Sequence, residues 1–259
     1  EVGIRVDSIR QANEECSKRG MYPLVPHCYF GDTFGDCVTA SFSISTSTFQ
    51  YTFVERHRPF SQGIDHIAIA ICDIDWWVTR YKHLGFETVY TPHQSEDGLI
   101  EGKESAMRTY ALRRGGWTVA LVEGVNRKRV SQITTYARLH GEHSAHHAAL
   151  HTPHLVDTVD ALLNSGAGFR SCRIPSPGEM VTAQHTIHTS SDDAGQFFQC
   201  FTKPFMRKGG KGGFFFELIE RCESRDNQGI QSFDDGTVLG LYESIEREIQ
   251  ACDKSVIFS

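Results

Sequence analysis

Three segments of the chain repeat one order of apolar and polar positions. Each begins with an apolar run typical of a strand, continues with the spacing of an amphipathic helix, and ends at a glycine. Gly20, Gly85 and Gly166 stand where a helix would end in a left-handed cap. The repeated segments are residues 1–20, 66–85 and 147–166.

Each repeat closes with a further strand-like run, at residues 51–56, 117–124 and 214–221. Residues that commonly cap helices precede each predicted helix: Asp7 or Ser8, Asp73 or Asp75, and Asp157. Between helix and closing run there is room for two more strands. We therefore predict an α+β fold of repeated βαβββ modules.

Composition limits the classes of protein. The chain of 259 residues is long enough for one large domain or two smaller ones, and its net charge of -6 argues against nucleic acid as the main partner. No apolar run approaches the roughly 18–20 residues that span a bilayer, and no signal peptide opens the chain. The 8 cysteines include no CxxC pair, which favours free thiols. We expect a cytoplasmic protein without membrane partners and leave a homo-oligomer open.

One carboxylate stands in an apolar strand. In the stretch 212-GGFFFELIER-221, Glu217 directly follows three phenylalanines. Burying an ionised carboxylate costs several kcal/mol unless it is paired or bound to a metal. An exposed strand face, an arginine partner or a coordinated cation would each account for this residue.

Two histidines occupy equivalent positions in their repeats. His66 and His147 both begin the first strand of their unit. If the two units pair into one curved sheet, their first strands lie side by side, and both imidazoles converge with Glu217. Two histidines and one carboxylate are typical of non-haem Fe(II) oxygenases. We predict one mononuclear Fe(II) site per chain, formed by His66, His147 and Glu217.

The sequence resembles the 4-hydroxyphenylpyruvate dioxygenase family in six motifs, which follow the family's order. They are 63-GIDHIAIAICDID-75, 131-SQITTY-136, 147-HAALHT-152, 199-QCFTKP-204, 214-FFFELIER-221 and 242-YESIEREI-249. The resemblance implies the vicinal-oxygen-chelate, glyoxalase-like fold and places the family's iron ligands on His66, His147 and Glu217. It also implies that the family's first module is missing from this chain.

The resemblance implies a division of the chain into two domains. Residues 1–58 would be a partial N-terminal domain of one module. Residues 62–250 would be a catalytic domain, with two modules closing a half-barrel around the metal and a C-terminal helix. That helix, at residues 238–249, would either gate the open end of the half-barrel or pack as ordinary core. Residues 206–213 are expected to form a loop between two strands.

The function that the resemblance implies is an Fe(II)-dependent dioxygenase. It would decarboxylate and hydroxylate an aryl-2-oxo acid, foremost 4-hydroxyphenylpyruvate to homogentisate in tyrosine catabolism, with dioxygen as co-substrate. Gln199 would hydrogen-bond substrate or oxygen, and Phe201, Phe215 and Phe233 would wall the pocket. A 4-hydroxymandelate-synthase-like or other 2-oxo-acid dioxygenase is the second reading. A non-catalytic homologue that binds a metal or small molecule is the third.

The pocket departs from the family pattern at several positions. His146 stands where the family has glutamine, and Val238 where it has an aromatic residue. Thr109 and Glu123 take the places of small polar substrate contacts. Strand alternation predicts that the side chains of His146 and Cys200 both point away from the iron. These departures leave the substrate open.

Overall fold

The computed structural model describes most of the chain, with 13 strands and 6 helices in the described part. This confirms the predicted α+β fold of βαβββ modules. Most of the predicted loop at 206–213 lies outside the described residues. These are 2–32, 35–44, 49–56, 63–92, 97–170, 178–192, 195–205, 212–222, 233 and 235–257.

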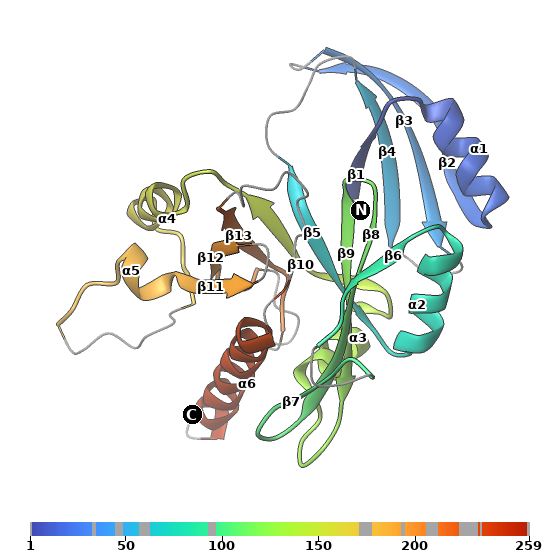
Figure 1. Ribbon diagram of the computed structural model, residues 1–259. Helices are drawn as coiled ribbons and strands as arrows, with labels where there is room; N and C mark the ends of the chain where they lie inside the picture. The colour runs from blue at the N-terminus through green and yellow to red at the C-terminus, as the bar shows by residue number, and fades with distance from the viewer. Residues whose placement is uncertain are drawn as a thin grey trace.

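The N-terminal module forms a sheet of its own. Its strands lie in the order β1-β4-β3-β2, with β1 and β4 parallel and β1 at one edge (Figure 1). The first strand therefore pairs with the last strand of the module, which is the βαβββ order predicted from the sequence. The elements are β1 (Val2–Val6), α1 (Ile9–Lys18), β2 (Met21–Asp32), β3 (Gly35–Ile44) and β4 (Gln50–Arg56).

The second and third modules share one curled sheet, in the order β11-β12-β13-β10-β5-β9-β8-β6, with β7 paired to β8. The first strands of the two modules, β5 and β10, are antiparallel neighbours at its centre, as predicted. The elements are β5 (Ile64–Ile71), α2 (Ile74–His83), β6 (Glu87–Tyr90), β7 (Leu99–Glu101), β8 (Ala106–Arg114), β9 (Trp117–Val125), α3 (Gln132–His140), β10 (Ser144–His151), α4 (Leu155–Asn164), α5 (Ala183–Thr186), β11 (His188–Asp192), β12 (Gly195–Phe201), β13 (Phe215–Arg221) and α6 (Asp235–Ile257).

The three repeat helices begin in a common way. A glutamate on the last strand of each module accepts a hydrogen bond from the first backbone N–H of that module's helix. Glu55 Oε2 lies 2.7 Å from the nitrogen of Ile9, and Glu220 Oε2 lies 2.6 Å from the nitrogen of Leu155. Glu123 accepts in the same way from Ile74. A carboxylate at a helix N-terminus also interacts favourably with the helix dipole.

Two of the three predicted caps are confirmed, and the third is wrong. Ser8 and Asp73 accept hydrogen bonds from the first turns of α1 and α2. His154, not Asp157, precedes α4, and it makes no side-chain cap bond. The carboxylate of Glu220 satisfies that helix start from a neighbouring strand, a tertiary contact that local sequence does not reveal.

One hydrophobic core joins the N-terminal sheet to the large sheet. Phe53 of β4 belongs to the same buried cluster as Trp77 of α2 and Leu121 of β9. The hydroxyl groups of Tyr51 and Tyr81 are hydrogen-bonded across this contact. Beside it, between β1, α1 and the outer face of β5 and β10, lies a hollow of about 1410 Å³.

No helix in the described ranges combines the length and apolar character needed to cross a bilayer. The cysteines recorded there as free thiols are Cys16, Cys28, Cys72, Cys200 and Cys222. Cys200 packs with Leu155 and Leu218 on the α4 side of the sheet, so it points away from the inner face as predicted.

Candidate metal centre

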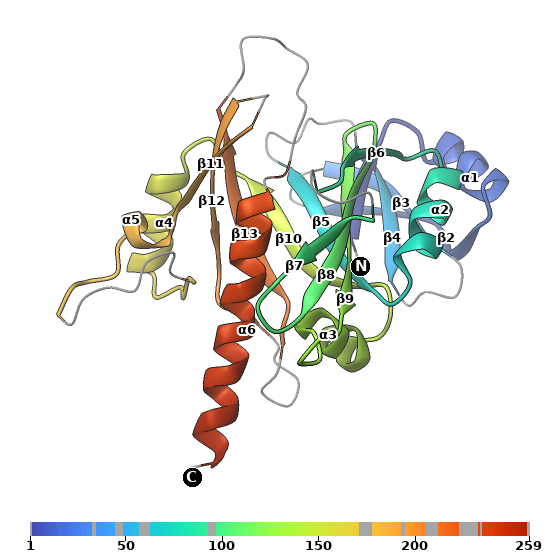
Figure 2. The same cartoon turned by 60° about the horizontal axis from the view of Figure 1, so that its bottom comes forward.

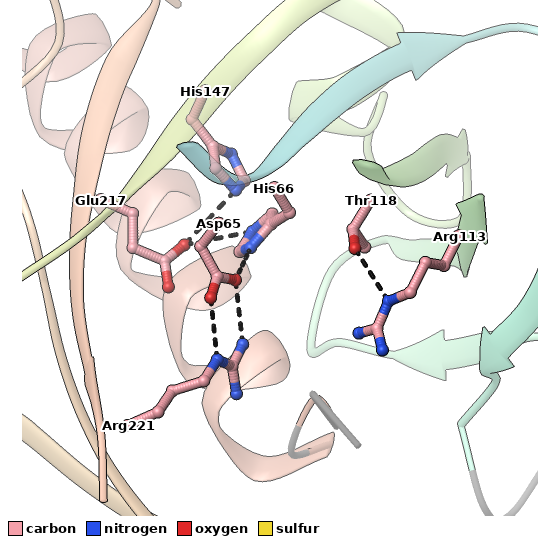
Figure 3. Close-up of polar contacts among 7 residues, drawn as sticks. All are labelled: Asp65, His66, Arg113, Thr118, His147, Glu217 and Arg221. Carbon is pink, nitrogen blue, oxygen red and sulfur yellow. Dashed lines mark hydrogen bonds and ion pairs between the residues drawn. The ribbon is translucent and has the colours of Figure 1, made fainter. Parts of the chain in front are cut away.

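The inner face of the curled sheet brings His66, His147 and Glu217 together (Figure 3). One ligand atom from each residue lies within 4.8 Å of the others. Oε2 of Glu217 is 3.5 Å from Nε2 of His66 and 3.6 Å from Nε2 of His147. The three residues are only 3%, 7% and 3% exposed, in the order His66, His147, Glu217.

Strand register explains why these side chains meet. Ala149 on β10 pairs with His66 on β5 at one side and with Glu217 on β13 at the other. Paired residues point to the same face of a sheet, and so do residues two apart on one strand, which adds His147. Ala149 lies between His66 and Glu217 in the sheet, and its side chain is a single methyl group. Space therefore remains between the donor atoms of the cluster.

The buried charges act on the two imidazoles in opposite directions. Burial disfavours the protonated form of His66, but the carboxylates of Glu217 and Asp65 outweigh it and raise its pKa to about 9. Burial, together with neighbouring His146 and His66, holds the pKa of His147 well below its usual range. Without a metal, these shifts favour a positively charged imidazolium at His66 and a neutral imidazole at His147.

The donor set fits a divalent first-row metal ion. Two imidazole nitrogens and a carboxylate oxygen are ligands that such ions accept, and a cation would compensate the buried charge of Glu217. In the part of the chain that the structure describes, these are the histidine, cysteine and acidic side chains whose ligand atoms gather closely enough to hold an ion. The structure thus brings together all three residues predicted from the sequence.

A cavity of about 60 Å³ adjoins the cluster. Gln199, Phe201 and Phe233, which were predicted to face the substrate, all line it. The ring centroid of Phe233 lies 4.8 Å from that of His66. Phe215 lies outside the lining and stacks on His147, with ring centroids 4.7 Å apart.

The α6 helix covers this cavity from one side. It runs beside β12 and β13 (Figure 2), where Ile245 packs against Phe201 and Phe215. Its residues Thr237 and Val238 line the cavity. The predicted C-terminal helix therefore contacts the site directly.

Thr109 and Glu123, two residues that depart from the family pattern, have different positions relative to the cavity. Thr109 lines the cavity, as expected. Glu123 does not, because its carboxylate accepts the first N–H of α2 and pairs with Arg108 at 3.3 Å. The resemblance placed Glu123 in the altered pocket, but it does not line the cavity in this structure.

The prediction for His146 also needs correction. Strand alternation would turn its ring away from His147, but its Nδ1 lies 3.0 Å from Nδ1 of His147. The pairing of β10 with β5 shifts by one residue between Ala145 and His147, so His146 is an extra residue in the strand. Its ring remains outside the three-residue cluster.

Sequence reasoning missed Asp65 and Arg221. Asp65 Oδ1 lies 2.9 Å from Nδ1 of His66, and Arg221 holds Asp65 through two hydrogen bonds of 2.8 and 3.0 Å (Figure 3). The sequence contained one signal for Arg221. It lies four positions after Glu217 on the same strand, so alternation places both side chains on the same face. Nothing in the alternation of β5 indicated that Asp65 would join that face.

Comparison with known proteins finds 4-hydroxyphenylpyruvate dioxygenases. The chain is 24% identical over 196 residues to the enzyme of Caenorhabditis briggsae, covering 68% of this chain and 46% of that protein. It is 22% identical over 298 residues to the enzyme of Pyricularia oryzae, covering 96% of this chain and 68% of that protein. The chain thus spans about half the length of the Caenorhabditis relative. No family model matches the chain.

Solved structures show the same fold. A mutant of 4-hydroxymandelate synthase from Streptomyces coelicolor superposes with a TM-score of 0.71 at 20% identity, covering 95% of this chain and 76% of that one. A fusion of a xylose isomerase-like TIM barrel with a 4-hydroxyphenylpyruvate dioxygenase superposes with a TM-score of 0.58 at 19% identity, covering 95% of this chain and 41% of that one.

The paired βαβββ modules, with the donor cluster on the inner face of their shared sheet, have the vicinal-oxygen-chelate fold. The chain is similar to 4-hydroxyphenylpyruvate dioxygenases, which confirms the resemblance seen in the sequence motifs.

Proposed function

We propose that the protein is an Fe(II)-dependent dioxygenase that oxidatively decarboxylates and hydroxylates an aryl-2-oxo acid. The observation that supports it most is the buried cluster of His66, His147 and Glu217 beside an otherwise mainly apolar cavity. One Fe(II) ion per chain, held by these three residues, would supply the activation of dioxygen and the binding of the 2-oxo acid. The proposed substrate is 4-hydroxyphenylpyruvate, with homogentisate as product, in tyrosine catabolism.

The side chains around the cluster have separate roles in this proposal. The amide of Gln199 can both donate and accept a hydrogen bond, so it would orient substrate or oxygen. Phe201 and Phe233 would pack against the aromatic ring and exclude water from the reacting atoms. The rings of His147 and Phe215 are stacked, which would keep that ligand from turning.

Substrate entry requires a rearrangement of the α6 side of the cavity. The free volume of about 60 Å³ is far below the roughly 300–1,000 Å³ of typical small-molecule pockets. Among the helices and strands that line the cavity, α6 is the one that is not a strand of the sheet. Side-chain hydrogen bonds attach it to strands: the hydroxyl of Tyr90 donates to Asp235 at 2.5 Å, and that of Tyr242 donates to the carbonyl of Ala106 at 3.1 Å. We infer that Thr237 and Val238 move aside when a substrate binds.

A second candidate has a specific observation behind it. The fold superposes on that of a 4-hydroxymandelate synthase mutant with a TM-score of 0.71, so the reaction named for that enzyme is a second candidate. The same metal ligands and substrate could then give hydroxylation at the benzylic carbon, since the pose of the ring decides which carbon reacts. A protein that binds a metal or small molecule without turnover is the third candidate.

Oxygen uptake separates these candidates. The purified chain is loaded anaerobically with Fe(II) and mixed with 4-hydroxyphenylpyruvate, phenylpyruvate or an aliphatic 2-oxo acid, and products are identified by mass spectrometry. We expect uptake and carbon dioxide release with the aryl acids, and homogentisate from 4-hydroxyphenylpyruvate. A mandelate product selects the second candidate. Full iron occupancy with no uptake from any acid selects the third and rejects the proposed function.

A further inference from the structure

We propose that Asp65 and His146 are positioning residues, each of which fixes one histidine of the cluster with its Nε2 directed at the metal. Each precedes its ligand by one residue, Asp65 before His66 and His146 before His147. The inference rests on the proposed metal site. It does not depend on the substrate or on turnover.

Both residues owe their orientation to a break in strand register. In the ladder between β10 and β5, Ala145 pairs with Ile69 and His147 pairs with Ala68. His146 is therefore an extra residue in β10. Farther along, Ala149 faces His66 while Leu150 faces Ile64, which leaves Asp65 as an extra residue in β5. A β-bulge re-aims a side chain that alternation would send to the other face. The two bulges lie at equivalent places in the two modules.

The contacts of Asp65 determine where His66 carries its proton. The Asp65 side chain is only 2% exposed, and its Oδ1 lies 2.9 Å from Nδ1 of His66. An ionised carboxylate only accepts hydrogen bonds, so Nδ1 of His66 must be the donor. In the neutral ring Nε2 then has a free lone pair, and Nε2 is the atom that faces Glu217 at 3.5 Å.

Arg221 keeps Asp65 in this role. Its Nε and Nη2 donate to the two oxygens of Asp65 at 2.8 and 3.0 Å, so the carboxylate is held in a two-point arrangement. The guanidinium also lies over the ring of Phe197, 5.5 Å from its centroid. Rotation of Asp65 away from His66 would break both of these charge-assisted hydrogen bonds, which is costly for a carboxylate as buried as this one.

His146 performs the equivalent task for His147 without a charge. Nδ1 of His146 lies 3.0 Å from Nδ1 of His147, so these two nitrogens share one hydrogen bond. Nε2 of His147 faces Glu217 at 3.6 Å and is free to bind a metal only if the shared proton sits on Nδ1 of His147. His146 is then the acceptor. Its ring is fixed by Tyr136, with centroids 4.9 Å apart.

Asp65 and His146 should differ in how strongly they affect metal binding. An anionic acceptor makes the donor ring a stronger ligand than a neutral acceptor does, because the hydrogen bond is charge-assisted. Loss of such an outer partner typically weakens metal binding by about 10- to 100-fold. We expect Asp65→Asn to fall near the upper end of that range, because it loses the charge and keeps only one acceptor oxygen for the donors of His66 and Arg221. His146→Leu should fall near the lower end. His146→Gln should stay near wild type, since its amide oxygen can accept the same proton.

Cobalt(II) is the probe for the test, because it replaces iron in such sites and shifts the proton signals of its ligands in NMR spectra. Affinity is measured by competition with a chromophoric chelator. Wild type should show two shifted, solvent-exchangeable imidazole N–H signals, one for each histidine. Asp65→Asn should speed the exchange of one signal and His146→Leu that of the other. Asp75→Asn is the control, because Asp75 also pairs with an arginine, Arg108, but is exposed and belongs neither to the cluster nor to the cavity lining.

Circular dichroism and thermal unfolding of each metal-free variant separate positioning from folding. If Asp65→Asn does not fold because its ion pair with Arg221 is lost, the double variant Asp65→Asn, Arg221→Gln removes both charges and takes its place. The proposal is overturned if a folded Asp65 variant binds cobalt as wild type does and keeps both slow signals. It is also overturned if wild type binds cobalt and shows no exchangeable N–H signal. Wild type with both signals but no oxygen uptake would reject the proposed function alone.

Discussion

The N-terminal module and the third module share one chain order and differ at their inner faces. In each module the first strand runs parallel to the last, and a glutamate of the last strand bonds the start of the helix. In the N-terminal sheet, Gly3 pairs with Thr52, whereas in the large sheet the pair at the same place is Ala149 and Glu217. Thr52 makes a neutral hydrogen bond with Ser41 at 2.7 Å.

The difference shows that the module alone does not make a site. β1 is an edge strand, whereas β5 and β10 lie next to each other at the centre of their sheet. Only a pair of first strands brings two histidines of equivalent position onto one face. The inward-facing residue on the last strand of a module then determines whether a carboxylate lies beside the two histidines. The following predictions test this comparison.

The largest effect is expected from Glu217. Glu217→Gln keeps the shape and removes the charge, and Glu217→Thr installs the residue of the N-terminal module. Both should lower metal affinity by at least about 100-fold, since a ligand is lost, and abolish oxygen uptake. Isothermal titration and an oxygen electrode measure the two losses.

The control for this prediction is the exposed Glu87 on β6, whose change to Gln should leave both readouts unchanged. Glu223, a glutamate nearer to Glu217 in the sequence, lies outside the described residues and is not used as the control. Full iron occupancy and turnover in Glu217→Gln would mean that the carboxylate is not a ligand.

The second prediction concerns the core shared by the two sheets. Phe53→Ala should destabilise the protein by about 3–5 kcal/mol, because a buried ring between β4 and the large sheet is replaced by a cavity. Urea unfolding followed by both fluorescence and circular dichroism should shift as one transition. Tyr29→Ala, at an exposed position of β2, should cost little. Two separated transitions in wild type would contradict a common core.

The third prediction concerns pH. Burial lowers the pKa of His143 to about 3, while in the unfolded chain it is about 6.5. Its contribution to stability is therefore complete above about pH 6.5 and is lost as the pH falls toward 3, at up to about 1.4 kcal/mol per pH unit. The ring stacks on Trp77, and its Nε2 lies 2.9 Å from the hydroxyl of Tyr81.

The measurement is urea unfolding between pH 7 and 4 in wild type and in His143→Asn. Asparagine suits the positive φ of 59° at this position, although it loses the stacking with Trp77. The variant should be less stable at pH 7 but lose less stability on acidification. Parallel curves for the two proteins would show that His143 is not the group responsible.

The smallest effect is expected from the glutamate that accepts a hydrogen bond from the start of the helix in each module. Glu55→Gln and Glu220→Gln should each cost about 0.5–2 kcal/mol, since a charged acceptor at a helix N-terminus becomes a neutral one. Thermal unfolding of both variants measures the loss. Similar losses in the two variants are expected, with Glu87→Gln as the unaffected reference. No loss in either would mean that water satisfies these helix starts equally well.

Periodicity predicted the parts of the fold that depend on regular alternation. The modules, the closing strands and the meeting of His66, His147 and Glu217 all follow from residues spaced two apart on paired strands. The failures arise where regularity is broken or where a partner comes from elsewhere in the chain. One extra residue in each central strand re-aimed Asp65 and His146. The contacts of Glu123 and Glu220 are with the starts of α2 and α4, which are far from these residues in the sequence.

The pairing of β5 with β10 relates the two modules by an approximate twofold rotation. His66 and His147 are exchanged by it, and Ala68 is exchanged with Ala149. The partner of Ala149 on β13 is Glu217, and the partner of Ala68 on β9 is Ala120. Perfect symmetry would therefore place a second carboxylate opposite the first. Ala120 lines the cavity instead, so this single alanine leaves the side of the cluster opposite Glu217 accessible to an incoming ligand.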